Sequence, residues 1–445
     1  MRSLFIVLII LKYVALYGQI PNCNGGNDGI NDLPGYPSNA PKLTMYSGYI
    51  QVNESVNGSL FYWFIESLSH SINTPLLVWL NGGPGASSLY GLFAENGPFR
   101  INSDGKTLSY NNYTWITHYH MLFVDQPIDT GFSFCNQGGW VNNEDLLGQN
   151  FVTFLHGFYQ CHSNFKSNPL YITGESYAGK YIPFIGKHII MDGTMNLKGL
   201  VIGNGHYDPT IMFTHGPRYA YITGILDEYE YSNIEQQINY CLNLVNTNCD
   251  LASDICLNVT NNIYAIDGGN IFQYDIRVLD ADFFDGMSAN IANYLSLPDV
   301  VSAIHTQGIP WKDSDGTSSP NPVFNALKCD VMLNNSAILI PYAIDNNIRV
   351  LFYNGQFDGS IWGNYGNQAC LAQYNYKGTW NKLPKKVFYV LNDVYNIKMT
   401  AGYVKESNDK MLTYIVISDS GHLVPYDQPK NIREILINWI QKGNW

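Results

Sequence analysis

The chain has 445 residues, of which 46% are hydrophobic and 13% charged, and 24 Lys and Arg residues against 36 Asp and Glu residues give it a formal net charge of −12. This length favours one large core with an insertion, or two modest domains, over a small scaffold. The acidic balance argues against nucleic acid as a partner, because a protein that binds phosphate backbones needs an excess of Lys and Arg.

The first 18 residues are typical of a signal peptide. Arg2 precedes an eight-residue apolar run from Leu4 to Leu11, and a short segment then ends near Gly18. The run is too short for a transmembrane helix, which needs about 20 apolar residues, and no other stretch approaches that length. We therefore expect a mature protein without a membrane span in the secretory or endolysosomal route, with lysosome, vacuole and secretion all open as destinations.

Asn57-Gly58 lies between two β-prone runs in residues 46–67, which predicts an antiparallel hairpin opening a sheet. Five Asn-x-Ser/Thr sequences are candidate glycosylation sites in such a compartment. They begin at Asn53, Asn57, Asn112, Asn258 and Asn334. The position at a hairpin tip favours Asn57 among them.

Four short, continuously apolar runs follow, at residues 76–80, 121–124, 170–173 and 200–202. Strands that are buried on both faces have this composition. Between residues 141 and 160, Phe and Leu recur at helical spacing, so strand and helix signals alternate. This β-α-β rhythm predicts an α/β fold with a mostly parallel central sheet.

The rhythm is interrupted at residues 206–322, which contain three clustered cysteines and a Thr-Ser-Ser-Pro-Asn-Pro stretch. We interpret this segment as a largely helical cap subdomain inserted between two parts of one core, residues 19–205 and 323–445. Strand signals return at residues 349–353 and 387–391. The chain then ends in a helix whose apolar stripe we expect to pack in the core: Ile432, Ile435, Leu436, Trp439 and Ile440.

All eight cysteines follow the signal peptide: Cys23, Cys135, Cys161, Cys241, Cys249, Cys256, Cys329 and Cys370. An even number of cysteines in an oxidising route favours disulfides. Zinc is the weaker alternative, because the chain has no Cys-x-x-Cys pair and no histidine at ligand spacing from the clustered cysteines. We therefore predict disulfides and no metal.

Residues 171–179 read Tyr-Ile-Thr-Gly-Glu-Ser-Tyr-Ala-Gly and precede a helix-compatible stretch at residues 180–190. A β-prone run that turns sharply at a serine between small residues is typical of a nucleophile elbow. The small neighbours leave room for a strained turn, and the start of the following helix stabilises developing negative charge. Ser176 is therefore a candidate nucleophile, although a lone serine in a glycine-rich turn is more often only a turn.

A serine nucleophile needs a base and a group that orients the base. Asp358 follows one predicted strand and His422 follows a later one, and the order Ser, Asp, His is that of α/β-hydrolases. Taken singly, Asp358 has the alternative role of capping a loop, and His422 that of a core histidine whose ring nitrogens are hydrogen-bonded for structural reasons alone. Together with Ser176, each at the end of a predicted buried strand, they favour a catalytic triad.

A glycine-rich loop follows the strand at residues 76–80 and is a candidate for half of an oxyanion hole. An α/β-hydrolase takes one backbone N–H from such an early loop and one from the residue after the nucleophile. Gly83 and Tyr177 are the candidates. A phosphate cradle is the competing interpretation, but the loop lacks the Gly-Lys-Ser/Thr ending that a phosphate site would need.

Three motifs resemble the serine carboxypeptidase family: Trp-Leu-Asn-Gly-Gly-Pro-Gly-x-Ser-Ser at residues 79–88, Gly-Glu-Ser-Tyr-Ala-Gly at 174–179 and Gly-His-x-Val-Pro-x-Asp-Gln-Pro at 421–429. Supporting matches extend along nearly the whole mature chain. Gln356 stands where many members carry Asp and is similar to the vitellogenic-like branch. The resemblance implies an α/β-hydrolase fold and peptide substrates with a free C-terminus, with no cofactor, and it leaves a homodimer open.

By the same resemblance, Asn81, Gly82, Glu95 and Glu175 would bind the C-terminal carboxylate of a substrate. Three carboxylates in one pocket cannot all be ionised, so shared protons would raise the pKa values of the two acids and favour binding at acidic pH. The alternative is that Glu175 only braces the elbow and Glu95 is a surface acid. Because His422 must be neutral to act as a base, the two demands predict a bell-shaped pH profile.

Three departures from the family pattern affect details. Ala86 replaces a common cysteine, which leaves the pairing of Cys329 open, and Leu423 stands where Met is usual. Asp129 replaces a glycine near the expected mouth of the site, where an extra acid would alter preference beside the scissile bond. None of these departures touches the proposed triad.

The function expected from these patterns is a serine carboxypeptidase that releases C-terminal amino acids at acidic pH through an acyl-enzyme. An acyltransferase on the same scaffold would share the triad, so the triad does not separate these two activities. A secreted binding protein without catalysis is the third alternative, although such a protein has no physical need for Ser176, Asp358 and His422 together.

Overall fold

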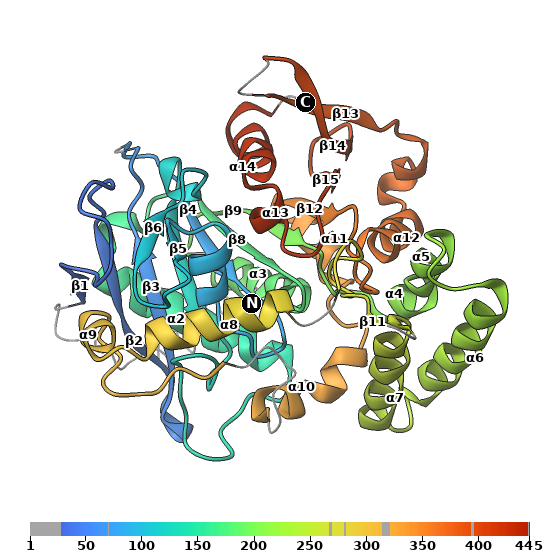
Figure 1. The fold of residues 1–445 in the computed structure, drawn as a ribbon, viewed down its shortest axis with the longest axis horizontal. Helices are drawn as coiled ribbons and strands as arrows, with labels where there is room; N and C mark the ends of the chain where they lie inside the picture. Colours follow the sequence, from blue (N-terminus) through green and yellow to red (C-terminus); the bar gives the residue numbers. More distant parts are fainter. Residues whose placement is uncertain are drawn as a thin grey trace, which may run out of the picture.

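The computed structural model of the chain describes residues 28–69, 71–266, 269–279, 282–313, 321–392, 396–443 and 445. The predicted signal peptide, Cys23 and residues 317–320 lie outside the described residues. An 11-stranded sheet organises the described part of the fold (Figure 1). Its strand order is β1-β2-β3-β7-β4-β8-β9-β12-β15-β14-β13.

Six strands at the centre of the sheet run parallel to one another: β7 (His120–Asp125), β4 (Leu76–Leu80), β8 (Leu170–Glu175), β9 (Leu197–Gly203), β12 (Arg349–Gly355) and β15 (Leu412–Ile417). Every residue of β4, β7, β8 and β15 is buried. Strands buried on both faces are apolar along their whole length. The prediction of an α/β fold with a mostly parallel central sheet is confirmed.

Antiparallel strands extend the sheet on both sides: β1 (Gly29–Ile30), β2 (Met45–Asn53) and β3 (Gly58–Ile65) beside β7, and β14 (Lys398–Glu406) and β13 (Lys386–Leu391) beside β15. The predicted hairpin is confirmed, because Asn57 has a left-handed φ of 49° between β2 and β3. The apolar-run signal misses β14. That strand exposes its first three residues and therefore has no apolar run.

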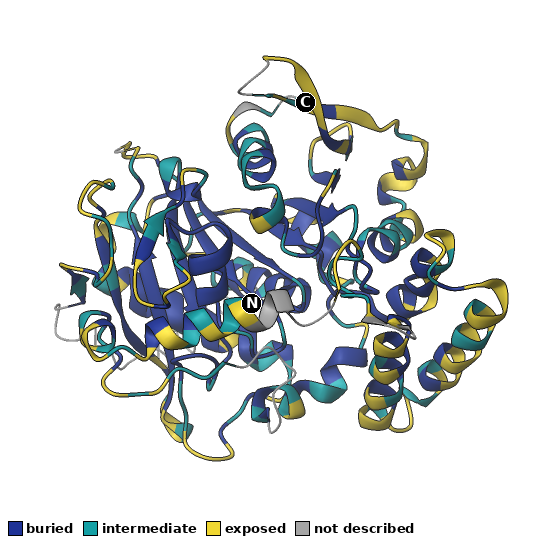
Figure 2. Cartoon of the chain, viewed as in Figure 1, coloured by how far each residue is buried: buried dark blue, intermediate teal, exposed yellow. Residues whose placement is uncertain are grey.

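Helices cover both faces of the sheet. On one face, Val78 of β4 packs in an apolar cluster with α2 (Glu144–Cys161) and α3 (Ala178–Asp192). On the other face, its neighbour Trp79 packs in a cluster with α14 (Pro429–Ile437), so the predicted C-terminal stripe lies in the core. Figure 2 shows the buried residues filling the sheet and the helix faces turned to it. Within the described part of the chain, no helix is long and apolar enough to cross a membrane.

Between β9 and β12 the chain is largely helical, in the region where the sequence predicts the cap. Helices α5 to α7 stand together at one end of the molecule, whereas α8 runs in front of the sheet and α9 lies near its β1–β2 edge (Figure 1). The elements in this stretch are α4 (Pro209–His215), α5 (Pro217–Ile222), α6 (Glu228–Leu244), α7 (Cys249–Asn262), β10 (Ala265–Ile266), β11 (Gly269–Asn270), α8 (Asp282–Leu295), α9 (Pro298–Ala303), α10 (Pro322–Met332) and α11 (Leu339–Asp345). The domain boundaries at residues 206 and 322 remain a prediction.

Smaller elements complete the described fold. A two-stranded sheet pairs β5 (Phe99–Ile101) with β6 (Leu108–Tyr110), and a π-helical turn, Gly91–Glu95, precedes it. Helices α12 (Asn364–Tyr374) and α13 (Val424–Asp427) follow β12 and β15. Helices α12 and α13 therefore follow the carboxyl ends of parallel strands, the edge at which ligands bind in open α/β sheets.

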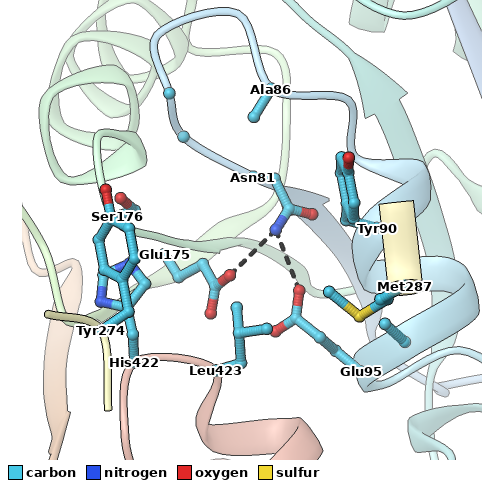
Figure 3. A pocket seen from close by; sticks show the side chains of 13 residues that line it. Asn81, Ala86, Tyr90, Glu95, Glu175, Ser176, Tyr274, Met287, His422 and Leu423 are labelled. Carbon is cyan, nitrogen blue, oxygen red and sulfur yellow. Dashed lines mark hydrogen bonds between the residues drawn. The ribbon is translucent and has the colours of Figure 1, made fainter. Parts of the chain in front are cut away.

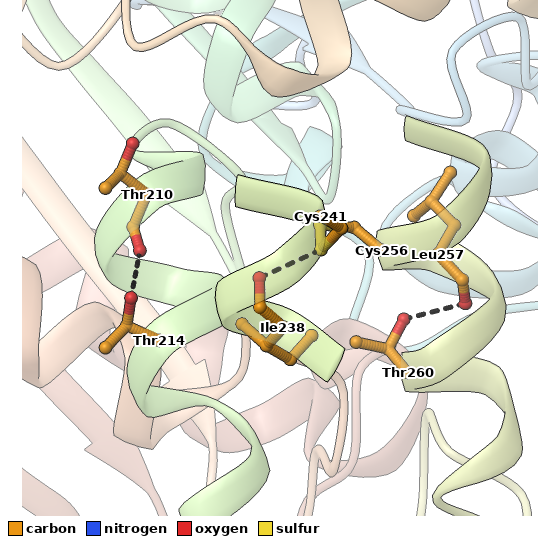
Figure 4. The surroundings of a disulfide bond; sticks show 7 residues. All are labelled: Thr210, Thr214, Ile238, Cys241, Cys256, Leu257 and Thr260. Atoms are coloured by element: carbon orange, nitrogen blue, oxygen red, sulfur yellow. Dashed lines mark hydrogen bonds between the residues drawn. A yellow bond between two sulfur atoms is a disulfide. The ribbon is translucent and has the colours of Figure 1, made fainter. Parts of the chain in front are cut away.

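Disulfides tie the helical region together. Cys241 joins Cys256 between α6 and α7 (Figure 4), and Cys249 joins Cys329 between α7 and α10; Cys161 is disulfide-bonded as well. The three clustered cysteines therefore offer no thiolate to zinc. The prediction of disulfides is confirmed for these cysteines, whereas Cys135 and Cys370 are free. Cys370 is buried in α12, where a thiol packs like a small apolar side chain.

Candidate active site

Ser176 lies at the turn between β8 and α3, with a left-handed φ of 62° that residues other than glycine rarely adopt. Its amide donates to the carbonyl of Gly203 at 2.9 Å, and its carbonyl accepts from the amide of His206 at 2.9 Å. A Cβ on Gly82 would lie 2.3 Å from the nitrogen of Tyr177, so glycine is required where the early loop approaches the turn. These contacts hold a strained serine at a strand-to-helix turn, which is the geometry of a nucleophile elbow.

Asp358 follows β12 and His422 follows β15, so both residues lie at the carboxyl ends of neighbouring parallel strands. Nδ1 of His422 lies 2.7 Å from Oδ2 of Asp358. Oδ1 of Asp358 accepts from the amide of Ser360 at 3.0 Å and from its hydroxyl at 2.6 Å. Because Nδ1 faces the carboxylate, Nε2 is the ring nitrogen that remains to accept a proton. His422 and Ser176 line one pocket (Figure 3). Because Asp358 contacts His422, the structure brings the three candidates together.

The two predicted oxyanion donors lie beside the serine. The amide of Tyr177 sits at the start of α3, and Gly83 has a φ of 102°, which favours glycine. Neither amide donates to an acceptor among the described residues. Both N–H groups are therefore available to an oxygen bound next to Ser176.

Asn81 joins the two acids that the resemblance singles out. Its Nδ2 donates to Oε1 of Glu95 at 3.0 Å and to Oε1 of Glu175 at 3.0 Å (Figure 3). Its Oδ1 accepts from Nε1 of Trp79 at 2.8 Å and from the amide of Gly91 at 3.0 Å, which fixes the amide orientation. Both glutamates are almost fully buried, so the alternative that Glu95 is a surface acid is wrong.

The glutamate pair favours protonated carboxyl groups. Burial raises the pKa of Glu95, and burial together with the charge of Glu95 raises the pKa of Glu175 well above its ordinary value. The Oε2 atom of each acid has no donor within hydrogen-bond distance among the described residues. Arg100 donates to the backbone carbonyl of Glu95 at 2.5 Å, and burial lowers the pKa of its guanidinium to about 10. The pair can therefore hold a proton and present it to a ligand.

A second buried polar group lies behind the elbow and was not singled out in the sequence. The hydroxyl of Tyr177 donates to Oε1 of Glu144 at 2.5 Å, and the amide of Glu144 donates to Oδ2 of Asp330 at 2.8 Å. Burial raises the pKa of Glu144 well above its ordinary value. These bonds tie α3 to α2 and to α10.

The remaining lining of the pocket is mostly apolar. Ala86 and Leu423, noted as departures in the sequence, both line it, and so do four residues that the sequence signals miss: Tyr90, Ala94, Tyr274 and Met287. Among the described residues, the lining contains no acid apart from Glu95 and Glu175, and it contains neither Lys nor Arg. Tyr274 and Met287 come from a segment far from the motifs, so only the fold brings them to the site, whereas Tyr90 and Ala94 closely follow the motif at residues 79–88.

Asp129 is not among the residues that line this pocket. Its carboxylate forms an ion pair with Lys312 and accepts from Nε1 of Trp140 at 2.7 Å. Asp129 therefore does not supply a free acid next to the serine.

A parallel α/β sheet with a serine at a strained elbow and a His–Asp pair at the ends of later strands defines a serine hydrolase of the α/β-hydrolase class. Residues 34–442 match the family model described as serine carboxypeptidase, and the chain belongs to this family. The enzyme class is therefore that of the serine-type carboxypeptidases, as the sequence motifs predict.

Several relatives support this placement. A probable serine carboxypeptidase CPVL from Dictyostelium discoideum is 33% identical over 408 residues, covering 89% of this chain and 78% of its own. The vitellogenic carboxypeptidase of Aedes aegypti is 31% identical and covers 89% of this chain and 83% of its own. The crystal structure of Kex1(Δ)p, a prohormone-processing carboxypeptidase from Saccharomyces cerevisiae, superposes with a TM-score of 0.81 at 25% identity, covering 93% of this chain and 96% of that one. The predicted α/β-hydrolase fold is confirmed.

Proposed function

We propose that the protein releases single amino acids from the C-termini of peptides at acidic pH, with Ser176 as nucleophile, His422 as proton shuttle and Asp358 as the group that orients the histidine. The observation that carries this proposal is the placement of Asn81, Glu95 and Glu175 in the same pocket as Ser176 and His422. Groups suited to a terminal carboxylate thereby share one pocket with a nucleophile.

The reaction follows from the geometry in two halves. Oγ of Ser176 attacks the last peptide carbonyl while Nε2 of His422 takes its proton, and the amides of Gly83 and Tyr177 donate to the oxyanion. The C–N bond then breaks as His422 returns the proton to the leaving amine. Water attacks the resulting ester with its proton passing to His422 and then to Ser176, which releases the shortened peptide.

Recognition of the terminal carboxylate depends on protons held by the glutamate pair. A protonated Glu95 or Glu175 donates a hydrogen bond to the substrate carboxylate, as does an N–H of Asn81 or the backbone of Gly82, whereas two ionised glutamates would repel it. Since the pKa values of both acids are raised, these protons are present at acidic pH and are lost as the pH rises. Affinity for acid substrates therefore falls as the pH rises.

The pocket also favours particular leaving residues. Tyr90, Ala94, Met287 and Leu423 surround the space beside the glutamates, and apart from those two acids no described residue that lines this pocket is charged. A charged side chain would be desolvated without a partner, which is costly. Neutral apolar C-terminal residues are the expected substrates. Met287→Asp should shift preference from a C-terminal Leu toward Lys, measured as the ratio of kcat/KM for the two dipeptides.

The cellular route is part of the proposal. In this proposal the apolar N-terminus acts as a signal peptide, and the disulfides are consistent with an oxidising compartment. The preference for acidic pH suits a lysosome, a vacuole or secretion into an acidic fluid. Four candidate glycan acceptors, Asn57, Asn112, Asn258 and Asn334, are exposed. Asn53 is half-buried and its side chain accepts from the amide of Ser55 at 3.1 Å, so it is the least favoured.

The test compares an N-blocked dipeptide with its C-terminal amide across pH, using wild type, Ser176→Ala and the control Ser232→Ala, which removes an exposed hydroxyl from α6. We expect acid-favoured release of the C-terminal residue by wild type and the control, a preference of the amide for higher pH, and no release by Ser176→Ala. Release by Ser176→Ala at the wild-type rate would refute the assigned nucleophile. An added alcohol tests the acyltransferase alternative. If the protein is an acyltransferase, the alcohol should capture the acyl group in preference to water, and the ester should be the main product.

A further inference from the structure

A segment of the helical region lies against both catalytic loops. In residues 272–279, here called the clamp segment, the carbonyl of Tyr274 accepts from the amide of His422 at 2.7 Å. The amide of Ile276 donates to the carbonyl of Phe357, the residue before the triad aspartate, at 3.1 Å. One short segment therefore bonds to the backbone on both sides of the His–Asp pair.

Arg277 adds side-chain contacts to the same junction. Its Nε and Nη2 contact the two carboxylate oxygens of Asp275 at 2.8 and 2.6 Å. Its Nη1 lies 2.6 Å from Asp419 and its Nη2 lies 3.1 Å from Asp427, on either side of the histidine in sequence. Its guanidinium also stacks over the ring of Phe357, 5.0 Å from the centroid. A single guanidinium thus contacts both the histidine loop and the aspartate loop.

Asp427 transmits this contact to the histidine backbone. The Oδ2 atom that meets Arg277 also accepts from the amide of Gly421, the residue before His422, at 2.6 Å. The clamp segment approaches so closely that a Cβ on Gly421 would lie 2.6 Å from the carbonyl of Tyr274. The ring of Tyr274 lies 4.7 Å from the imidazole, centroid to centroid.

We propose that Arg277 is a positioning residue for the triad: it holds the loop of His422 against the loop of Asp358, so that the imidazole keeps its orientation toward Ser176. This inference rests on the proposed roles of the three triad residues. Arg277 lines a hollow next to the pocket that also contains His422, yet it is not among the residues lining the pocket with Ser176. It acts on the reaction through the histidine and not on the substrate.

The interaction is suited to this role because of its geometry. A guanidinium presents its donors in a planar fork, so several carboxylates fix its position more firmly than a lysine ammonium could be fixed. Only about 30% of the Arg277 side chain is exposed, and the carboxyl of Asp275 is more buried still, which limits screening by solvent. Small displacements of a catalytic base reduce turnover strongly, by up to about a hundredfold for 1 Å.

The test uses the full-length protein with Arg277→Met, Arg277→Lys and the control Arg218→Met, which removes an exposed arginine from α5. We expect Arg277→Met to lower kcat about 10- to 100-fold for an N-blocked dipeptide while KM changes less than about threefold. Arg277→Lys should recover part of the loss, because it keeps the charge but not the fork. Arg218→Met should match wild type.

A second readout separates positioning from general stability. The proton on Nδ1 of His422 that faces Asp358 gives a downfield ¹H NMR resonance when the pair is held together, and it should shift or broaden in Arg277→Met at a temperature where circular dichroism shows a folded protein. If Arg277→Met does not fold, Asp427→Asn serves instead, with a smaller loss of kcat and the same spectral change expected. A folded Arg277 variant with wild-type kcat, or an unchanged resonance, would overturn the proposal.

The outcomes also separate this inference from the proposed function. If Ser176→Ala is inactive and Arg277→Met is as active as wild type, only the positioning role fails. If Ser176→Ala retains activity, the triad assignment itself fails, whatever Arg277 does.

Discussion

Replacing Glu175 by Gln should flatten the pH dependence of substrate binding. The change is nearly isosteric: the Oε1 of glutamine can still accept from Nδ2 of Asn81, which lies 3.0 Å from Oε1 of Glu175 in the wild type. Its amide N–H₂ replaces a proton that the glutamic acid carries only at acidic pH. The variant therefore keeps a donor for the substrate carboxylate at every pH and loses one charge at neutral pH.

The size of the effect follows from the distances. Oε1 of Glu95 and Oε1 of Glu175 each lie 3.0 Å from Nδ2 of Asn81, so they are separated by at most twice that distance. If an ionised glutamate and a substrate carboxylate are taken to lie about 6 Å apart, their repulsion costs about 3 kcal/mol at an effective dielectric constant of about 20. Removing one such charge is worth about a hundredfold in KM.

The assay measures KM for an N-blocked dipeptide and for its C-terminal amide between pH 4 and pH 8, with Glu228→Gln on the exposed face of α6 as the control. The pKa values of Glu95 and Glu175 are raised, so wild type holds their protons at low pH, and KM for the acid should climb by at most about tenfold for each pH unit while each proton is being lost and then level off. Glu175→Gln should show a much smaller rise, and the amide should show little rise in either protein. Parallel KM profiles for acid and amide in wild type, or identical profiles for wild type and Glu175→Gln, would refute the shared-proton mechanism.

Three further results are expected. Asp358→Asn should lower kcat by about 10⁴-fold with little change in KM in the dipeptide assay, because the imidazole loses the partner of its Nδ1 at 2.7 Å; a loss below tenfold would contradict the triad. Burial raises the pKa of Glu144, so the stability that its bound proton contributes is fully present below the unfolded pKa near 4.5 and is lost as the pH rises through the folded pKa. The urea midpoint of wild type should therefore decrease as the pH rises above about 4.5, and Glu144→Gln should make this decrease with pH smaller. Replacing both Cys249 and Cys329 by Ser should cost about 2–4 kcal/mol in urea unfolding, since their disulfide closes a separation of 80 residues, and an unchanged midpoint would contradict this.

The sequence predicts the centre of this fold better than its margins. The run at residues 76–80 matches β4 residue for residue, because a strand covered on both faces has to be apolar along its length. The strand β14 has no such run, since its first three residues face solvent, and its place in the sheet depends on pairing with β15. Local patterns cannot identify a strand whose stability comes from its neighbour.

The candidate site divides in the same way. Ser176, Asp358 and His422 could be singled out because each ends a buried strand next to a turn, and both features are local. Tyr274 and Arg277 have no local signal, because their importance arises from contacts with residues 142 to 150 positions away. The sequence also gives no sign that Cys370 is a free thiol. An even number of cysteines favours disulfides in general, and only the fold shows that Cys370 is buried in α12 without a disulfide partner.

The clamp segment has a consequence for how the enzyme is made. The serine, the arginine, the aspartate and the histidine follow one another along the chain, and Asp427, the last contact of the cluster, follows the histidine. A nascent chain that has not yet been synthesised as far as Asp427 contains the nucleophile, but it lacks part of the cluster that holds the catalytic histidine in place. Peptidase activity should therefore appear only after Asp427 has been synthesised, and products truncated before β15 should be harmless to neighbouring polypeptides even if they fold in part.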